Sequence, residues 1–276
     1  MTSHWSTALR AELTKRAELH MTRVGAPGYL SLGPTPTRLF ETYADGTRHG
    51  NFVNASYQAI CAEPAWHART QKSHSQAQAL PTEKRPSARE LDSCNSSDAL
   101  LMNCFCYPGA AERAIAALLP SVSYSTPEFG VHGEVALVDG ERDTTEIDMR
   151  IGSAIFEAKL TERDFTSRPK SHVERYGRLS EVFQVGTLPQ TSDEYRGYQL
   201  IRNVLAANQH GWVFYVICDG RRPDLLREWW AVNSAIRDAQ LRARCGFLLW
   251  QEVARMCPSP LAAFLAQKYG LGDGLS

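Results

Sequence analysis

The chain has 276 residues, which is enough for one large domain or for one domain with an extension. Its 30 basic and 30 acidic side chains cancel, so no whole-protein field attracts polyanions, and any nucleic-acid site has to be a local basic patch. The apolar content of 43% is ordinary for a soluble globular protein, and no run reaches the ~18 apolar residues of a membrane span.

The cysteines favour a reducing compartment. There are seven of them, without regular spacing, which indicates free thiols and a cytoplasmic protein. Cys104 and Cys106 have no second Cys/His pair at zinc spacing, so we interpret them as small apolar residues of a buried segment. The first twenty residues are too polar for a signal peptide, and we expect no membrane association.

The N-terminal third reads as an extension made of a helix and loops. Residues 5–20 predict a surface helix, and residues 26–60 are rich in Gly, Pro and Asn with little periodicity. Residues 62–97 are polar, turn-rich and mildly basic, and are either an arm or lid or a plain solvated connector. We therefore predict an extension over residues 1–95 and a main domain over residues 96–276.

The main domain begins with two predicted helices. "SSDALLMNCFC" starts with a cap-like Ser-Ser-Asp and turns strongly apolar, which predicts a buried helix. "PGAAERAIAALLP" predicts a second helix over 108–120, with a proline near its start and another at its end. "GEVALVDG", residues 133–140, predicts a short strand that ends in an Asp-Gly turn.

The stretch "TTEIDMRIGSAIFEAKLTE", residues 144–162, predicts a β-hairpin. Apolar and charged residues alternate on both sides of a Gly-Ser pair, which is a two-residue loop signal. With Gly152 and Ser153 as the loop, Met149 faces Phe156 and Asp148 faces Glu157. One face is then an apolar core. The other is charged, and we expect it to face solvent, with the following residues on it: Glu146, Asp148, Glu157 and Lys159.

The charged face has two interpretations. Directly opposed Asp148 and Glu157 have side-chain bases about 5 Å apart and repel each other. A divalent cation between them would remove that repulsion, because hard cations prefer oxygen ligands. The alternative is an ordinary solvated face, on which Glu146 simply pairs with Lys159 across the strands.

The remaining elements complete a mixed α/β fold. After a loop-rich stretch, residues 193–211 predict a helix with one apolar side and with Arg196, Gln199 and Asn203 on the opposite side. "GWVFYVICD" predicts a central buried strand, "PDLLREWWAVNSAIRDAQLRAR" an amphipathic helix and "CGFLLW" a further strand. The order predicts a mixed central sheet flanked by helices, with three antiparallel strands and a fourth reached through a helical crossover.

At this point a family resemblance emerges. An αβββαβ core with Asp148 on the second strand and Glu157-x-Lys159 on the third resembles the PD-(D/E)XK nuclease superfamily, which has the restriction-endonuclease-like fold. "SSDALLMNCFCYP" and "EAKLTE" also look like a bacterial restriction-endonuclease-like branch of that superfamily. The resemblance covers about residues 95–220. The proline of the superfamily name is absent, because Ile147 stands in its place.

The resemblance implies a metal-dependent mechanism. Asp148, Glu157 and the backbone carbonyl of Ala158 would hold Mg²⁺, with Mn²⁺ able to substitute. The metal would lower the pKa of a bound water and offset charge that develops on the phosphate. Lys159 would orient or deprotonate that water, or stabilise the pentavalent phosphorus. Mg²⁺ keeps several waters, so two carboxylates suffice.

Two further residues are catalytic candidates under the same resemblance. Glu112 would be the acid that many members carry on the first helix, although an exposed Glu in a helix's first turn is equally expected from the macrodipole. Glu134 is a weaker alternative to it. Gln199 would be the polar residue that the helix after the Glu-x-Lys strand often adds. Its alternative is a place on a solvated helix face.

Aromatic and basic residues outside the motif have less specific interpretations. We assign Trp229 and Trp230 to packing rather than to base stacking. Four cations come after the active strand and either contact phosphates or belong to a solvated loop. They are Arg163, Arg168, Lys170 and Arg175.

The leading functional hypothesis is a Mg²⁺-dependent endonuclease that hydrolyses phosphodiester bonds in DNA. The alternatives are a catalytically silent nuclease-fold module that binds nucleic acid or acts as a scaffold, and a nuclease for structured RNA. A homodimer is plausible for an enzyme that cuts two strands. Other nucleophile chemistry has little support, because the sequence has no G-x-S-x-G, no H-E-x-x-H and no P-loop.

Overall fold

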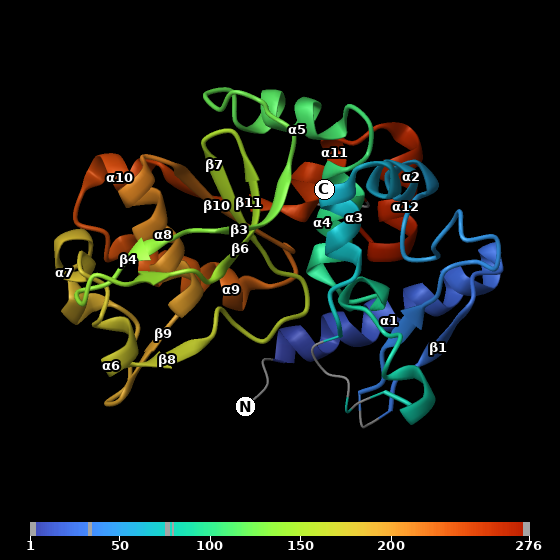
Figure 1. The fold of residues 1–276 in the computed structure, drawn as a ribbon, viewed down its shortest axis with the longest axis horizontal. Coiled ribbons are helices and arrows are strands. Elements are labelled where there is room, and N and C mark those ends of the chain that lie inside the picture. The colour runs from blue at the N-terminus through green and yellow to red at the C-terminus, as the bar shows by residue number, and fades with distance from the viewer. Residues whose placement is uncertain (1–3, 33–34, 75–77, 79, 273–276) are drawn as a thin grey trace. The chain divides into compact units, whose positions relative to one another are not determined.

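The computed structural model of the protein describes residues 4–32, 35–74, 78 and 80–272 (Figure 1). The chain divides into two compact units. The sheet unit comprises Glu128–Leu249 with the start of the chain through Trp5, and the helical unit comprises Ser6–Pro127 and the segment from Trp250 onward. The predicted boundary between residues 95 and 96 falls inside the helical unit, because the helices after it group with the N-terminal segments.

A five-stranded mixed sheet is the centre of the sheet unit, as the sequence predicted (Figure 1). Its spatial order is β11-β10-β7-β6-β3, with antiparallel pairing at β3–β6 and β6–β7 and parallel pairing at β7–β10 and β10–β11. The parallel neighbours β7 and β10 are joined by a helical crossover. The strands are β3 (Glu128–His132), β6 (Glu146–Ile151), β7 (Ala154–Ala158), β10 (Val213–Cys218) and β11 (Cys245–Leu249).

The hairpin of β6 and β7 has the predicted register. Met149 pairs with Phe156, and Ile151 pairs with Ala154. Gly152 adopts φ 55°, a left-handed backbone that favours glycine in a two-residue loop. In β6 only the apolar residues are fully buried. In β7 every residue is buried, so both faces of that strand are covered. The hairpin therefore lies inside the unit and is not a surface ribbon.

Three predicted elements differ in the structure. The helix predicted over 193–211 begins only at Tyr198, because Glu194–Arg196 form a strand and Gly197 adopts a left-handed backbone with φ 68°. The first strand of the sheet is Glu128–His132, not residues 133–140, because Glu134 turns the chain with φ 47°. The segment after that turn forms β4 (Val135–Ala136), which pairs with β5 (Arg142–Asp143) in a separate two-stranded sheet. The single helix predicted from Pro223 onward is in fact two helices, because Asp238 caps the start of a new one through its side chain.

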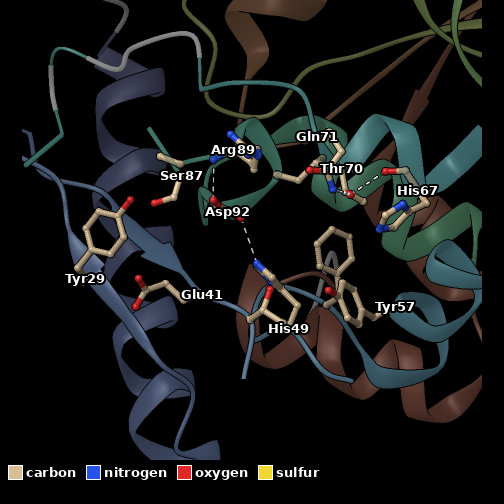
Figure 2. Close-up of a pocket in the computed structure, with 14 residues that line it drawn as sticks. Tyr29, Glu41, His49, Tyr57, His67, Thr70, Gln71, Ser87, Arg89 and Asp92 are labelled. Carbon is tan, nitrogen blue, oxygen red and sulfur yellow. Dashed lines mark hydrogen bonds and ion pairs between the residues drawn. The ribbon is translucent and has the colours of Figure 1, made fainter. Parts of the chain in front are cut away.

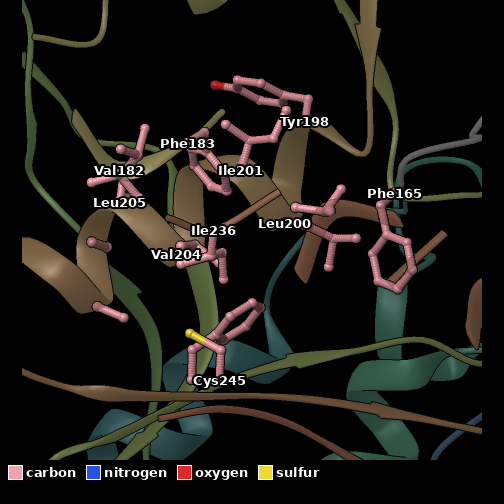
Figure 3. Close-up of a cluster of buried hydrophobic side chains, with 14 of the residues drawn as sticks. Phe165, Val182, Phe183, Tyr198, Leu200, Ile201, Val204, Leu205, Ile236 and Cys245 are labelled. Atoms are coloured by element: carbon pink, nitrogen blue, oxygen red, sulfur yellow. The ribbon is translucent and has the colours of Figure 1, made fainter. Parts of the chain in front are cut away.

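Helix α8 (Tyr198–His210) packs its apolar side into the core of the sheet unit (Figure 3). Leu200, Ile201 and Val204 are fully buried there, next to Phe183 and Ile236 from neighbouring segments. This packing fixes which side of α8 faces the sheet. The other elements of the unit are β8 (Ser167–Pro169), β9 (Glu194–Arg196), α6 (Lys170–Val173), α7 (Leu179–Val182), α9 (Pro223–Ser234) and α10 (Ala239–Ala243), with a 3₁₀ turn η4 (Val185–Thr187).

The helical unit begins with the predicted N-terminal helix and a small antiparallel pair, β1 with β2. The polar segment 62–97 contains α3 and two 3₁₀ turns, while residues 75–77 and 79 of it lie outside the described part. The elements are α1 (His4–Val24), β1 (Gly28–Leu30), β2 (Arg38–Phe40), α2 (Asn54–Ala62), α3 (Pro64–Thr70), η2 (Thr82–Lys84), η3 (Glu90–Asp92), α4 (Ser97–Phe105), α5 (Ala110–Leu118), α11 (Trp250–Met256) and α12 (Ser259–Tyr269). Among the described helices, none combines the length and the apolar character needed to cross a bilayer.

Candidate active site

Of the two carboxylates predicted to oppose each other, Asp148 lies on β6 and Glu157 lies near the end of β7. Continuing the observed register places Asp148 opposite Glu157. Asp148 is half-buried, and its Oδ2 accepts a hydrogen bond of 2.8 Å from the backbone N–H of Ala158. The Asp148 side chain is therefore anchored to the strand that carries Glu157.

Glu157 is the centre of the cluster and is completely buried. Its Oε1 accepts hydrogen bonds from Lys159 Nζ and from Gln199 Nε2, each at 2.7 Å. Its Oε2 accepts one from Asn203 Nδ2 at 2.8 Å and lies 3.8 Å from the guanidinium of Arg202. Two charges and two amides thus surround a carboxylate that water does not reach.

The expectation that the charged side of the hairpin faces solvent is wrong for Glu157 and Lys159. Lys159 is only 6% exposed, and α8 places Gln199, Arg202 and Asn203 against Glu157. The alternation of the strands indicated two faces, but it did not show that a later helix covers the charged one.

Electrostatics keep this pair ionised. Burial by itself raises the pKa of the Glu157 carboxyl, but the positive charges of Lys159 and Arg202, with the hydrogen bonds to the carboxylate, outweigh it and lower that pKa. Burial lowers the pKa of the Lys159 ammonium, yet the nearby carboxylates, Glu157 first among them, outweigh it and raise that pKa. Lys159 is consequently a cation at neutral pH.

Gln199 lies in the first turn of α8, and within the described part of the chain the hydrogen bonding of its side-chain amide is incomplete. Its Nε2 donates to Glu157, while its Oε1 is buried and has no hydrogen-bond partner among the described residues. A buried acceptor without a partner is unfavourable and calls for an explanation such as a water or an ion. This oxygen lies beside the carboxylate of Glu157, where the sequence predicted a metal.

A cluster of hydroxyl groups holds the start of α8 in place. Tyr198 donates to Asp143 Oδ2 at 3.0 Å, and the Tyr176 hydroxyl bonds to the same oxygen. Burial raises the pKa of Asp143, but hydrogen bonds from Thr145 and the two tyrosines outweigh it and bring the value to about 2. Because Tyr198 directly precedes Gln199, this anchor also positions Gln199 against Glu157.

Comparison with protein families supplies the context for this geometry. The family model described as "Restriction Endonuclease associating with ARP" (REase-ARP) matches residues 17–270, which is most of the chain. The chain belongs to the REase-ARP family. No curated protein and no solved structure matches it. The REase-ARP match supports a restriction-endonuclease-like domain, while the narrower PD-(D/E)XK assignment remains a proposal.

Sequence reasoning put Asn203 on the same side of the helix as Gln199 without assigning it to the site, and it overlooked Arg202 and Glu228. Arg202 and Asn203 come three and four positions after Gln199, so the helical repeat puts all three on one side of α8. That spacing was the available signal. Glu228 on α9 could not be singled out from the sequence. Burial and the charge of Asp164 raise its pKa to about 7, and both of these causes depend on the tertiary structure. The positive charge of Lys159 opposes that rise.

Other residues predicted for the site are not in this cluster. Glu112 is exposed on α5 of the helical unit, and Glu134 is exposed and paired with Arg142 at 2.8 Å. Trp229 is packed against Phe214, as expected, whereas Trp230 is 58% exposed. The four cations of the loop after β7 already have neighbours: Arg163 pairs with Asp164, Arg175 pairs with Asp139 and Glu141, Arg168 lies over Tyr198, and Lys170 lies over Tyr195.

The donor atoms of this REase-ARP site are oxygens, on Asp148, Glu157 and Gln199, which is the ligand type that hard cations prefer. Within the described residues there is no group of three or more His, Cys, Asp or Glu side chains arranged as metal ligands. Such a sparse set does not suit zinc but does suit Mg²⁺, which needs only one or two carboxylates beside its waters. Glu157 Oε2 accepts one hydrogen bond from the described residues and keeps capacity for a further contact, and Gln199 Oε1 lacks any such partner.

Proposed function

We propose that this protein is a metal-dependent nuclease that hydrolyses phosphodiester bonds, with DNA as substrate and Mg²⁺ as cofactor. The observation that carries the proposal is the cluster of Asp148, Glu157 and Lys159, completed by the Gln199 oxygen that has no partner among the described residues. Membership of a restriction-endonuclease-associated family supports it.

Each residue has a distinct role in this proposal. Asp148, Glu157, the carbonyl of Ala158 and Gln199 Oε1 would bind the ion. When bound, the ion lowers the pKa of a water and offsets negative charge on the phosphate. Lys159 would orient or deprotonate that water, or stabilise negative charge that develops on the phosphate. Asn203 and Arg202 hold the carboxylate of Glu157 in orientation.

A second candidate is a nuclease-fold module that binds nucleic acid without cutting it. One observation favours it: Glu157 is fully buried, and Lys159 occupies one of its oxygens as in a structural ion pair. Structured RNA is the alternative substrate for an active enzyme, because the same cluster would hydrolyse either backbone.

The test is a cleavage assay on supercoiled plasmid, linear plasmid, a single-stranded circle and a structured RNA, with Mg²⁺, Mn²⁺ or EDTA. We expect cutting with either metal and none with EDTA. Asp148→Asn should slow it by at least about 100-fold, since the loss of a direct ligand exceeds that of an outer-shell partner. Glu181→Gln, an exposed acid paired with Arg178 on the surface, is the matched control.

The outcomes separate the candidates. Cleavage by the Asp148→Asn protein at the wild-type rate would remove Asp148 from the mechanism. Binding of DNA without cleavage under every metal condition would favour the silent module, and cleavage of RNA alone would change the substrate.

A further inference from the structure

The helical unit contains a pocket that is separate from the hairpin cluster (Figure 2). Its volume is about 330 Å³, and every residue that lines it belongs to the segment 29–92 of that unit. Its walls come from β1, the loop before α2, α2 itself, the end of α3, and the turn that leads into η3 together with η3. This volume is near the lower limit for small-molecule sites, so the pocket suits one compact ligand.

One wall of the pocket is aromatic. The ring of His49 lies 5.5 Å from that of Phe52 and 5.7 Å from that of Tyr57, measured between ring centroids. His49 is fixed in place, because its Nδ1 accepts the backbone N–H of Asn51 and its Nε2 donates to Asp92 at 3.1 Å. With both nitrogens engaged, His49 contributes its ring rather than a free nitrogen.

The opposite wall combines a phenol with an ion pair. Tyr29 lies there beside Glu41, as Figure 2 shows, and Lys84 Nζ pairs with Glu41 at 2.5 Å while lying over the Tyr29 ring. Burial, with the charges of Asp92 and Glu41, raises the pKa of Tyr29 to about 12. Tyr29 therefore keeps its proton and can donate a hydrogen bond, and Glu41 can accept one.

The rim of the pocket supplies a cation and polar groups. Within the part of the chain that the structure describes, the Arg89 side chain donates one hydrogen bond, to the carbonyl of Pro86, and so keeps donors for a ligand. The backbone N–H of Arg89 anchors Asp92 at 2.6 Å, which ties the rim to His49. Gln71 donates to Thr70 and offers its amide oxygen, and Ser87 lies beside Arg89 (Figure 2).

We propose that this pocket binds a single nucleotide, with its base against the aromatic wall and its phosphate at Arg89. Aromatic rings are the usual platform for an unstacked base, and hydrogen-bond donors and acceptors at the base edge are what Tyr29 and Glu41 provide. Arginine matches a phosphate in geometry and charge. A wholly apolar ligand is disfavoured, because the lining includes the charged side chains of Glu41, Arg89 and Asp92.

The nucleotide has two possible sources with the same chemistry: a free mononucleotide, or a nucleotide unstacked from a bound strand. The second source rests on the proposed function, because the pocket would then bind one nucleotide of the strand that the nuclease cuts. The first source does not depend on the nuclease activity.

The test is calorimetric titration of the full chain with the four deoxynucleoside 5′-monophosphates, their nucleosides and inorganic phosphate. We expect at least one mononucleotide to bind with a Kd below about 1 mM. Ser87→Phe, which fills the pocket from its exposed rim, should weaken binding at least tenfold. Arg89→Gln should weaken the mononucleotide at least fivefold and leave the nucleoside unchanged. Arg113→Gln, an exposed arginine of the same unit outside the pocket, is the control.

Two results would overturn the proposal. One is the absence of binding by every mononucleotide below 1 mM, and the other is equal binding by wild type and Ser87→Phe. Thermal unfolding of Ser87→Phe shows whether it folds, and Arg89→Gln provides the second, milder perturbation. Mononucleotide binding is titrated in EDTA and needs no cleavage, so a failed nuclease assay leaves this test intact.

A second arm identifies the source. A fluorescent duplex with one unpaired nucleotide is titrated in EDTA against wild type and Ser87→Phe. Weaker binding by the variant, together with displacement by mononucleotide, assigns the pocket to a strand. Equal duplex binding, combined with mononucleotide binding that Ser87→Phe abolishes, assigns it to a free nucleotide.

Discussion

Replacement of Lys159 by methionine tests the buried ion pair at the centre of the sheet unit. Lys159 and Glu157 are 2.7 Å apart, with side chains 7% and 1% exposed. Methionine keeps most of the aliphatic volume of lysine and removes only the charge. The variant therefore isolates the ion pair from the packing of the side chain.

The size of the expected loss depends on the groups that remain around Glu157. Removal of one partner from a buried pair costs about 3–5 kcal/mol, since it leaves an uncompensated charge. Here Gln199, Asn203 and the more distant Arg202 still contact the carboxylate, so we expect the lower end, about 3 kcal/mol. Glu157→Gln leaves two buried cations, Lys159 and Arg202, and should cost the upper end, about 5 kcal/mol.

The assay is urea unfolding at pH 7.5, followed by tryptophan fluorescence and far-UV circular dichroism. The double variant should be less destabilised than the sum of the singles by about 2 kcal/mol, which measures the coupling of the pair. Lys15→Met, at an exposed site, is the control. If the free energy of unfolding of Lys159→Met were within about 0.5 kcal/mol of the wild-type value, Lys159 would be solvated. That result would refute the burial of the Lys159–Glu157 pair.

Two further predictions concern the core and its titration. Phe156→Ala should lower the free energy of unfolding by about 3–5 kcal/mol, because Phe156 is fully buried, and a negligible loss would contradict its place in the hairpin register. Lys268 is 1% exposed, its Nζ has no hydrogen-bond partner among the described residues, and burial lowers its pKa to about 7. The unfolded chain then binds more protons than the folded one from about pH 7 to 10.5, so stability should rise with pH by up to about 1.4 kcal/mol per unit. Lys268→Met should lose this slope and be more stable than wild type at pH 7. Urea unfolding at pH 6, 7, 8 and 9 checks both points, and an unchanged slope in the variant would place the effect elsewhere.

Local pattern was sufficient for the hairpin and for the central strand β10. Alternation with period two, interrupted by Gly152-Ser153, specifies which residues pair, because a shift by one residue would turn every apolar side chain to the wrong face. The β-branched and aromatic run in β10 likewise indicated a central strand. Both signals are short in range, so the sequence carries them directly.

The edge of the sheet was less accessible to sequence reasoning. Residues 133–140 have a strand-like composition, yet the chain turns at Glu134 and the edge strand is the segment before it. Which of two adjacent segments joins a sheet depends on pairing with β6. That pairing is a long-range contact, and composition does not report it.

The sequence by itself determined the register of the hairpin that carries Asp148 and Glu157, and the helix that carries Gln199. Only the tertiary structure decided that α8 covers Glu157 and Lys159, that Gln199 Oε1 lacks a partner among the described residues, and that residues from Tyr29 to Asp92 enclose a pocket. Periodicity specifies the face on which a side chain lies. The groups that cover that face come from segments tens of residues away, and burial, pKa and cavities depend on those same segments.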